Sequence, residues 1–230
     1  MLSIKQICSA LNMKQKQRVT LLWNEYRGLI LFIILMSVIR SAIADWNTVP
    51  SGSMQPTIVE GDRILVNKLA YDLSLPFTNT SLFKLADPER GDIIIFDSEV
   101  SKIRLVKRVI GIPGDVISMR DNVLTINQQE LTYSASNKSI NYEDLSENLL
   151  GFEHMIRVKT KGSRSSSFQS LLIHSDLYLV LGDNRDNSAD SRYIGLVPRK
   201  EIIGRTRSVV MSFDYDDYYI PRKNRFFHTL

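Results

Sequence analysis

Short runs of apolar and β-branched residues, each bounded by turn residues, recur along the chain after residue 45. These runs are Arg63–Asn67, Ile93–Phe96, Ile103–Ile110, Val116–Met119, Val123–Ile126, Glu153–Val158, Leu177–Leu181 and Ile202–Met211. Runs of this length and composition are typical of β-strands. Since long stretches with the 3.6-residue period of an amphipathic helix are absent from this part of the sequence, the pattern predicts a mostly β domain.

Turn signals and polar stretches separate the predicted strands. The dipeptide Gly-Asp occurs at residues 61–62, 91–92, 114–115 and 182–183, and its first three copies stand directly before a predicted strand. Glycine permits a tight turn and aspartate bonds to nearby backbone groups, so we expect turns there. Ser134–Leu150 and the Ser-rich Thr160–Ser170 are polar, and they are interpreted as excursions from the strand pattern.

The N-terminal region has a different pattern. Gly28–Ile39 is a continuous apolar run, which extends to Ala44 if the Arg40 side chain reaches back to the lipid headgroups. As a helix, the 17 residues from 28 to 44 would span roughly 25 Å, against about 30 Å of hydrocarbon. This favours one retained membrane anchor. A buried helix, or a secretory signal cleaved after Ala42-Ile43-Ala44, remains an alternative.

Charge is distributed unevenly along the chain. Residues 1–44 hold six of the 29 lysines and arginines and one of the 25 acidic residues, a local net charge of +5. The other 186 residues have a net charge of −1. Positive charge beside the first apolar segment predicts a cytoplasmic N-terminus and an external main body. The near-neutral main body gives no reason to expect binding to nucleic acid.

The supply of metal-ligating residues is small. Cys8 is the single cysteine, so no intramolecular disulfide and no cysteine-based metal cluster is expected. The three histidines do not have HExxH spacing. We therefore predict neither a metal nor a cofactor.

Two hydroxyl groups stand two residues apart in Pro50-Ser51-Gly52-Ser53-Met54-Gln55-Pro56-Thr57. Glycine frees the backbone and proline restricts it, a combination that suits a tight turn displaying a side chain. The serines are either ordinary loop residues or candidate nucleophiles. A nucleophile needs a base, and none of the three histidines lies in a recognisable Ser-His-Asp signature.

A lysine is the other candidate base. Its ordinary pKa of about 10.4 must fall, and burial in an apolar setting lowers it. On a strand, Lys107 would share a face with Leu105 and Val109, which offers such a setting. The alternative is that Lys107 and Arg108 mark the edge of a sheet, where charge discourages aggregation.

The segment Gly182–Arg192, GDNRDNSADSR, has no apolar side chain larger than alanine and directly follows a predicted strand. Hydrogen bonds and ion pairs must hold it in place. It is either a solvated turn or a catalytic loop, since loops at strand ends commonly carry catalytic groups. The spacing and terminal glutamate of an EF-hand are missing, so a calcium loop is not indicated.

Taken in order between about Arg40 and Met211, the motifs PSGSMQPT, GDIIIF, KRVIGIPGD and GDNRDNSADSR closely resemble bacterial type I signal peptidase. That family consists of membrane-anchored serine proteases that remove signal peptides. The resemblance implies a β fold of antiparallel sheets with a small accessory subdomain, preceded by one transmembrane helix.

The resemblance also implies a role for individual residues. Ser53 matches the nucleophile and Lys107 the general base. Ser51 matches the oxyanion-hole serine, and Ser188 the serine that hydrogen-bonds the lysine and orients it. The remaining matches are ion pairs that support the site, Asp183 with Arg108 and Asp190 with Arg192, and the residues of shallow apolar substrate pockets, Val49, Pro50 and Met54.

Pattern and resemblance together predict the domain organisation. We expect a cytoplasmic basic arm (1–27), an anchor (28–44), a catalytic β domain (45–213) with an accessory insertion at about 120–176, and a C-terminal tail (214–230). The expected location is the inner (plasma) membrane, with a single pass and the catalytic domain on the periplasmic or extracytoplasmic side.

The implied reaction is cleavage of signal peptides from exported preproteins after small-x-small sites, by a monomer in contact with membrane lipid. Two alternatives remain at this point. One is a Ser/Lys protease that acts on itself or on a dedicated partner. The other is a catalytically silent, membrane-tethered binding protein.

Overall fold

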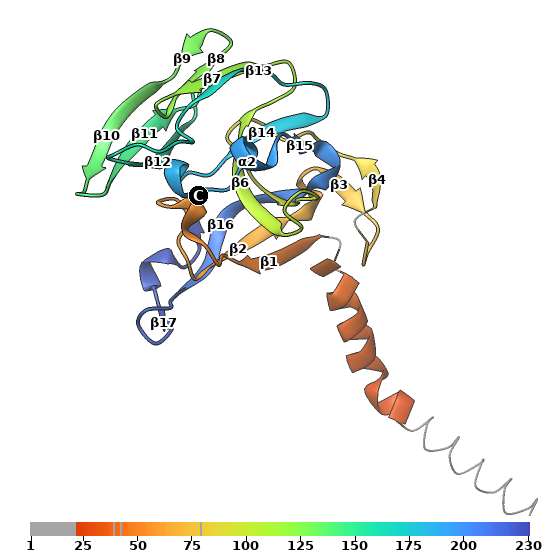
Figure 1. The fold of residues 1–230 in the computed structure, drawn as a ribbon. Helices are drawn as coiled ribbons and strands as arrows, with labels where there is room; N and C mark the ends of the chain where they lie inside the picture. The colour runs from red at the N-terminus through yellow and green to blue at the C-terminus, as the bar shows by residue number, and fades with distance from the viewer. Residues whose placement is uncertain (1–21, 39, 42, 79) are drawn as a thin grey trace, which may run out of the picture. The chain divides into compact units, whose positions relative to one another are not determined.

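The computed structural model describes residues 22–230 except 39, 42 and 79, and the chain folds as two compact units divided between residues 41 and 42 (Figure 1). In the first unit, residues 22–38 and 40–41 are helical. Among the residues described, none of the helices combines the length and the hydropathy required for a membrane span. Ala44, the last residue of the predicted anchor, is the first residue of a strand. The predicted basic arm covers residues 1–27, and its residues 1–21 lie outside the described residues.

A large antiparallel sheet forms the centre of the second unit. Its strand order is β1-β2-β16-β5-β6-β14-β15, and two short strands, β17 and β18, also pair with β16. The strands are β1 (Ala44–Thr48), β2 (Asp62–Asn67), β5 (Ile93–Asp97), β6 (Arg104–Gly111), β14 (Leu177–Leu181), β15 (Val197–Pro198), β16 (Ile202–Asp214), β17 (Ile220–Pro221) and β18 (His228–Thr229).

Smaller sheets carry the rest of the chain. Figure 1 shows β7 to β13 gathered together, away from β1 and β2. The orders are β10-β11-β12 and β13-β7-β8-β9, and β3 pairs with β4. Their strands are β3 (Asp72–Ser74), β4 (Ser81–Lys84), β7 (Val116–Arg120), β8 (Val123–Ile126), β9 (Gln129–Glu130), β10 (Thr132–Lys138), β11 (Tyr142–Asn148), β12 (Glu153–Lys159) and β13 (Phe168–Leu172).

Helical turns are short in this unit. They are α2 (Ser191–Ile194) and the 3-10 turns η1 (Gly52–Met54), η2 (Lys68–Ala70), η3 (Arg185–Asn187), η4 (Arg199–Glu201) and η5 (Lys223–Arg225). The prediction of a mostly β fold of antiparallel sheets is confirmed.

Three of the Gly-Asp pairs form the same turn. Gly61, Gly91 and Gly114 have φ angles of 88°, 91° and 93°, a backbone conformation that favours glycine. The aspartate that follows each glycine accepts a hydrogen bond from the backbone N–H three residues before it, at 2.8–3.1 Å. These turns start β2, β5 and β7, as the sequence predicts.

The expectation that Ser134–Leu150 departs from the strand pattern is wrong, because β10 and β11 occupy most of it. The buried positions of β11 include Asp144 and Glu147, which form ion pairs with Arg157 and Arg185. Polar residues therefore fill positions that apolar residues take in most strands, and a search for apolar runs misses them.

Candidate active site

Ser53 lies in the 3-10 turn η1, between a buried glycine and a buried methionine. Its side chain is half-buried. The turn is held from the polar segment 182–192, because the Asn184 backbone N–H donates to the Ser53 carbonyl at 3.0 Å. The Asn184 amide also donates to the Gly52 carbonyl at 3.0 Å. The polar segment thus fixes the backbone that carries Ser53.

Lys107 reaches Ser53 from the middle of the large sheet. Its strand, β6, is paired with β5 on one side and β14 on the other, so the alternative that Lys107 and Arg108 mark a sheet edge is wrong. The residue is 2% exposed. Its Nζ atom lies 2.9 Å from Ser53 Oγ and 3.0 Å from the Val106 carbonyl oxygen. A buried amine and a serine hydroxyl are therefore in direct contact.

The surroundings of Lys107 favour its neutral form. Burial lowers the pKa of the Lys107 amine to about 8, while Asp190 and Asp183 oppose this shift and Arg192 adds to it. With such a pKa, about a tenth of the lysine is neutral at pH 7, whereas an ordinary lysine is almost wholly charged. A neutral amine 2.9 Å from Ser53 Oγ can accept its proton.

Two further serines stand near this pair. The exposed Ser51 hydroxyl lies 3.5 Å from Ser53 Oγ, at the outer limit of a hydrogen bond. Ser188 is 9% exposed, and within the described part of the chain its Oγ atom has no hydrogen-bond partner. The bond from Ser188 to the lysine is therefore not formed in this structure, and its orienting role stays a prediction.

Both expected ion pairs are formed and buried. Arg108 binds Asp183 through two hydrogen bonds, at 2.8 Å and 2.7 Å. Burial alone would raise the pKa of the Asp183 carboxyl, but the Arg108 guanidinium holds that pKa below its usual range. Arg192 binds Asp190 through two bonds of 2.7 Å, and Asp190 also accepts the Gly182 backbone N–H at 3.0 Å.

One contact of this site was not expected from the sequence. The Thr57 hydroxyl donates to Asp183 at 2.6 Å, so the turn that carries the nucleophile is tied to the Arg108–Asp183 pair. Thr57 ends the motif PSGSMQPT, and this position is the one signal that could have drawn attention to it. Asn184 was likewise part of a noted motif without an assigned role.

The three predicted pocket residues occupy different environments. Val49 and Met54 are 3% and 1% exposed and pack in a core cluster with Ile58 and Ile64, whereas Pro50 is exposed. Only Pro50 of the three therefore presents its side chain to solvent here. Their contact with substrate stays a prediction.

Residues 23–211 match the family model described as "Signal peptidase, peptidase S26". The chain belongs to the signal peptidase family S26. Signal peptidase I from Pseudomonas aeruginosa is 37% identical over 201 residues, covering 80% of this chain and 70% of that protein. Signal peptidase I T from Bacillus subtilis is 31% identical, covering 87% and 90%. The family prediction, and with it a serine peptidase, is confirmed.

Among solved structures, a signal peptidase I from Enterococcus faecalis matches with 32% sequence identity and a TM-score of 0.36. The match covers 53% of this chain and 98% of that chain.

Another buried ion pair of this signal peptidase, Arg185 with Glu147, lies near the Arg108–Asp183 pair and was missed by the sequence analysis. The Arg185 guanidinium binds Glu147, which also accepts a hydrogen bond from the Tyr133 hydroxyl at 2.7 Å. His154 Nε2 lies 3.3 Å from Glu147 Oε1 and 3.9 Å from Asp183 Oδ1. Burial lowers the pKa of His154 to about 4, and Arg108 contributes. His154 is thus a neutral ring between two buried ion pairs.

Gly182 leaves space that Ser53 and Ser188 occupy. A methyl group added at its Cα would overlap Ser188 Oγ and the Ser53 carbonyl oxygen. We expect Gly182→Ala to reduce kcat by at least about tenfold, because displacement of Ser53 by a fraction of an ångström disturbs the reacting geometry. Single-turnover cleavage of a preprotein measures this effect.

The matched control is Gly195→Ala, in the turn after α2, where nothing lies within 4 Å of an added Cβ. Gly195 has a φ of 81°, so that substitution strains the backbone and lowers stability without filling the site. Equal kcat values for both variants would show that the space at Gly182 is not needed.

Proposed function

We propose that this protein is a signal-peptide endopeptidase in which Ser53 is the nucleophile and Lys107 the general base. The observation that carries the proposal is the 2.9 Å contact between Lys107 Nζ, in a buried residue, and Ser53 Oγ. Membership of the signal peptidase family supplies the substrate class, the signal peptides of preproteins.

The arrangement supports an acyl-transfer mechanism. Neutral Lys107 takes the Ser53 proton as Oγ attacks the carbonyl carbon of the scissile bond. The Ser53 backbone N–H and the Ser51 hydroxyl are the proposed donors to the developing oxyanion. The Lys107 ammonium then gives its proton to the leaving amine, which frees the mature N-terminus. Water, deprotonated by the same lysine, releases the signal peptide from Ser53.

The surrounding groups keep the dyad in position. Asp183 and Asp190 add negative charge near Lys107, while their arginine partners limit that charge. Ser188 is proposed to orient the lysine when substrate is bound. Val49, Pro50 and Met54 are proposed to contact the small residues of the small-x-small site.

We also propose the membrane arrangement that the resemblance implies. Helical residues 22–38 expose many large apolar side chains, among them Leu31, Phe32 and Leu35, which suits contact with lipid. The excess positive charge of residues 1–44 favours a cytoplasmic N-terminus and an external catalytic domain. Since both members of the dyad come from one chain, a monomer is sufficient for activity.

Cleavage of a preprotein should accelerate as the pH rises. The reactive form of Lys107 is neutral, and burial places its pKa at about 8. We expect kcat to increase about tenfold per pH unit below this value and to level off above it. Initial rates between about pH 6 and pH 10, with product mass read by mass spectrometry, test both the cleavage site and the base.

A preprotein with phenylalanine in place of the last small residue before the scissile bond is the substrate control, and we expect no product from it. A rate that is constant between about pH 6 and pH 9 would rule out a lysine base. Absence of any product from the Ala-x-Ala preprotein would rule out the proposed substrate class.

A further inference from the structure

The peptide unit that joins Gly52 to Ser53 contains the N–H group proposed above as a donor to the oxyanion. This N–H belongs to Ser53, and the carbonyl of the same planar unit belongs to Gly52. The bond between the two residues is trans, so the N–H and the carbonyl point in nearly opposite directions. A group that holds the Gly52 carbonyl therefore also sets the direction of the Ser53 N–H.

Among the described residues, two donors hold the Gly52 carbonyl oxygen. The Gln55 backbone N–H donates to it at 3.1 Å, from within the same turn. The Asn184 side-chain amide donates to it at 3.0 Å, from 132 positions away in the sequence. A carbonyl oxygen has two lone pairs, and both are used here. Asn184 is the donor that ties this peptide unit to the rest of the site.

Asn184 also holds the next peptide unit. Its backbone N–H donates to the Ser53 carbonyl at 3.0 Å, and the residue is 8% exposed. Two successive peptide units on either side of the nucleophile thus depend on one buried residue. Within the described part of the chain, the Ser53 N–H itself has no hydrogen-bond partner. This N–H is therefore available to a bound group.

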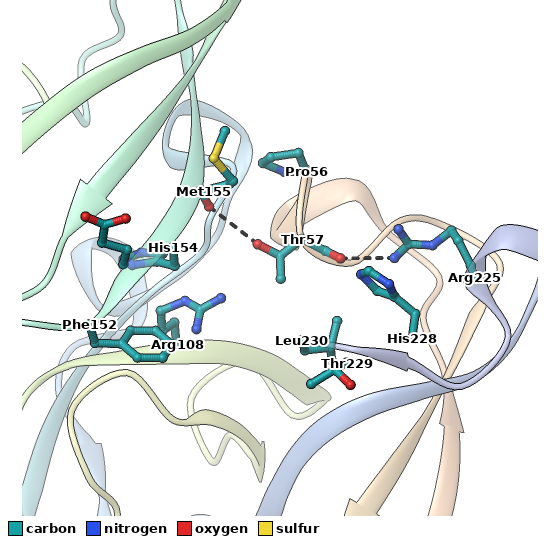
Figure 2. A pocket seen from close by; sticks show the side chains of 11 residues that line it. Pro56, Thr57, Arg108, Phe152, His154, Met155, Arg225, His228, Thr229 and Leu230 are labelled. Carbon is teal, nitrogen blue, oxygen red and sulfur yellow. Dashed lines mark hydrogen bonds between the residues drawn. The ribbon is translucent and has the colours of Figure 1, made fainter.

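Other contacts hold the far end of the turn. Figure 2 shows Thr57 linked to Met155 on one side and to Arg225 on the other. The Thr57 hydroxyl lies 3.4 Å from the Met155 carbonyl oxygen, and the Arg225 guanidinium donates to the Thr57 carbonyl at 3.0 Å. The Met54 side chain is buried in a core cluster. Since none of these contacts uses Asn184, we expect the turn to keep its place when the Asn184 side chain is changed.

We propose that Asn184 is a positioning residue for the oxyanion hole, because its side-chain amide holds the Gly52 carbonyl and so directs the Ser53 N–H at the oxygen of the scissile carbonyl. This role rests on the proposed function, since it takes Ser53 as the nucleophile. Asn184 itself does not touch the substrate. A small rotation of this peptide unit weakens the hydrogen bond to the oxyanion, which exists only in the transition state, and leaves substrate binding unchanged.

Asn184→Leu tests this role, because leucine has the branched shape of asparagine and lacks its amide donor. We expect kcat for preprotein cleavage to fall by about 10- to 100-fold, with KM changed by less than about twofold. The midpoint of the pH profile of kcat should stay in place, because the substitution changes no charge. The matched control is Asn137→Leu, on the exposed β10, which should leave kcat unchanged.

Two inhibitors distinguish a misdirected N–H from general damage to the site. A peptide aldehyde that ends in Ala-x-Ala adds to Ser53. Its carbon bonds to Oγ, its carbonyl π bond becomes a lone pair on oxygen, and the Ser53 proton moves to Lys107. The resulting oxyanion occupies the oxyanion hole, whereas the matching peptide alcohol binds without reaction. We expect Asn184→Leu to weaken aldehyde binding by at least about tenfold and alcohol binding by less than about twofold.

Asn184→Asp is a second variant of the same shape, in which a carboxylate oxygen faces the Gly52 carbonyl oxygen. At about pH 10, where Lys107 is neutral, it should lose at least as much aldehyde affinity as Asn184→Leu. Equal losses of aldehyde and alcohol binding in both variants, or unchanged aldehyde binding in either, would overturn the positioning role. Aldehyde binding to Ser53→Ala as tight as to the unaltered chain would instead overturn the proposed function.

Discussion

Lys107→Ala is expected to lower kcat for preprotein cleavage by about 10⁴-fold or more, the loss typical when one member of a catalytic unit is removed. The Lys107 amine contacts Ser53 Oγ and the Val106 carbonyl. Its removal takes an ionisable group out of a buried site and breaks no ion pair with any residue that the structure describes, so the fold should persist. Single-turnover kinetics with far-UV circular dichroism measures both properties.

Three further variants sharpen this test. Lys107→Arg should be as inactive as the alanine variant, because a guanidinium stays charged at every accessible pH. Lys161→Ala, at an exposed lysine, should retain full activity. Ser53→Ala combined with Lys107→Ala should be no slower than either single variant, because the two groups act as a unit. Multiplicative losses in the double variant, or substantial turnover by Lys107→Ala, would contradict the proposed dyad.

The fold was predictable where strands carry apolar residues. β5 and β14 are buried almost throughout, and their sequences, IIIFD and LYLVL, are correspondingly apolar. β11 was not predictable in this way, because its buried Glu147 is stabilised by Arg185, which is 38 residues away. Propensity and periodicity describe neighbours in the sequence, and they do not report which distant partner makes a buried charge tolerable.

The site was predictable only in part, for a related reason. The motif resemblance predicts roles for Ser53 and Lys107, which are separated by 54 positions, but their contact follows from the pairing of β6 inside the large sheet. The hydrogen bond from Thr57 to Asp183 spans 126 positions. Val49 and Met54 show a second limit of sequence reasoning. Both are apolar and lie close to Ser53 in the sequence, but they pack in a core cluster, and apolar character alone does not distinguish a pocket residue from a core residue.

The second large effect is expected at the buried pair of Arg185 and Glu147, both 0% exposed. Arg185→Met should lower the free energy of unfolding by about 3–5 kcal/mol, because it leaves the Glu147 carboxylate buried without its cation. Urea denaturation of the full chain measures this, and urea avoids the ionic screening that guanidinium would add. The surface control is Lys200→Met, which breaks the exposed pair with Glu99 and should cost less than about 1 kcal/mol.

The pH dependence of this loss of stability distinguishes two causes: a buried Glu147 carboxylate without its cation, and poorer packing at position 185. In the unaltered protein, burial raises the pKa of Glu147 but Arg185 more than offsets it, so the pKa is lowered. Without Arg185, burial dominates and the folded-state pKa rises above its unfolded value. Protonation then stabilises the folded variant, so the destabilisation should shrink as the pH falls from 8 toward about 5.

Replacement of both partners supplies the remaining control. Glu147→Leu together with Arg185→Met removes both charges and leaves apolar groups of similar size, which should restore at least half of the lost stability. A double variant as unstable as Arg185→Met, with a loss of stability that does not depend on pH, would contradict this. It would mean that packing of the Arg185 side chain stabilises the fold and that the ion pair does not. The opposite result would show that the charge pair is what allows Glu147 of β11 to be buried near Asp183.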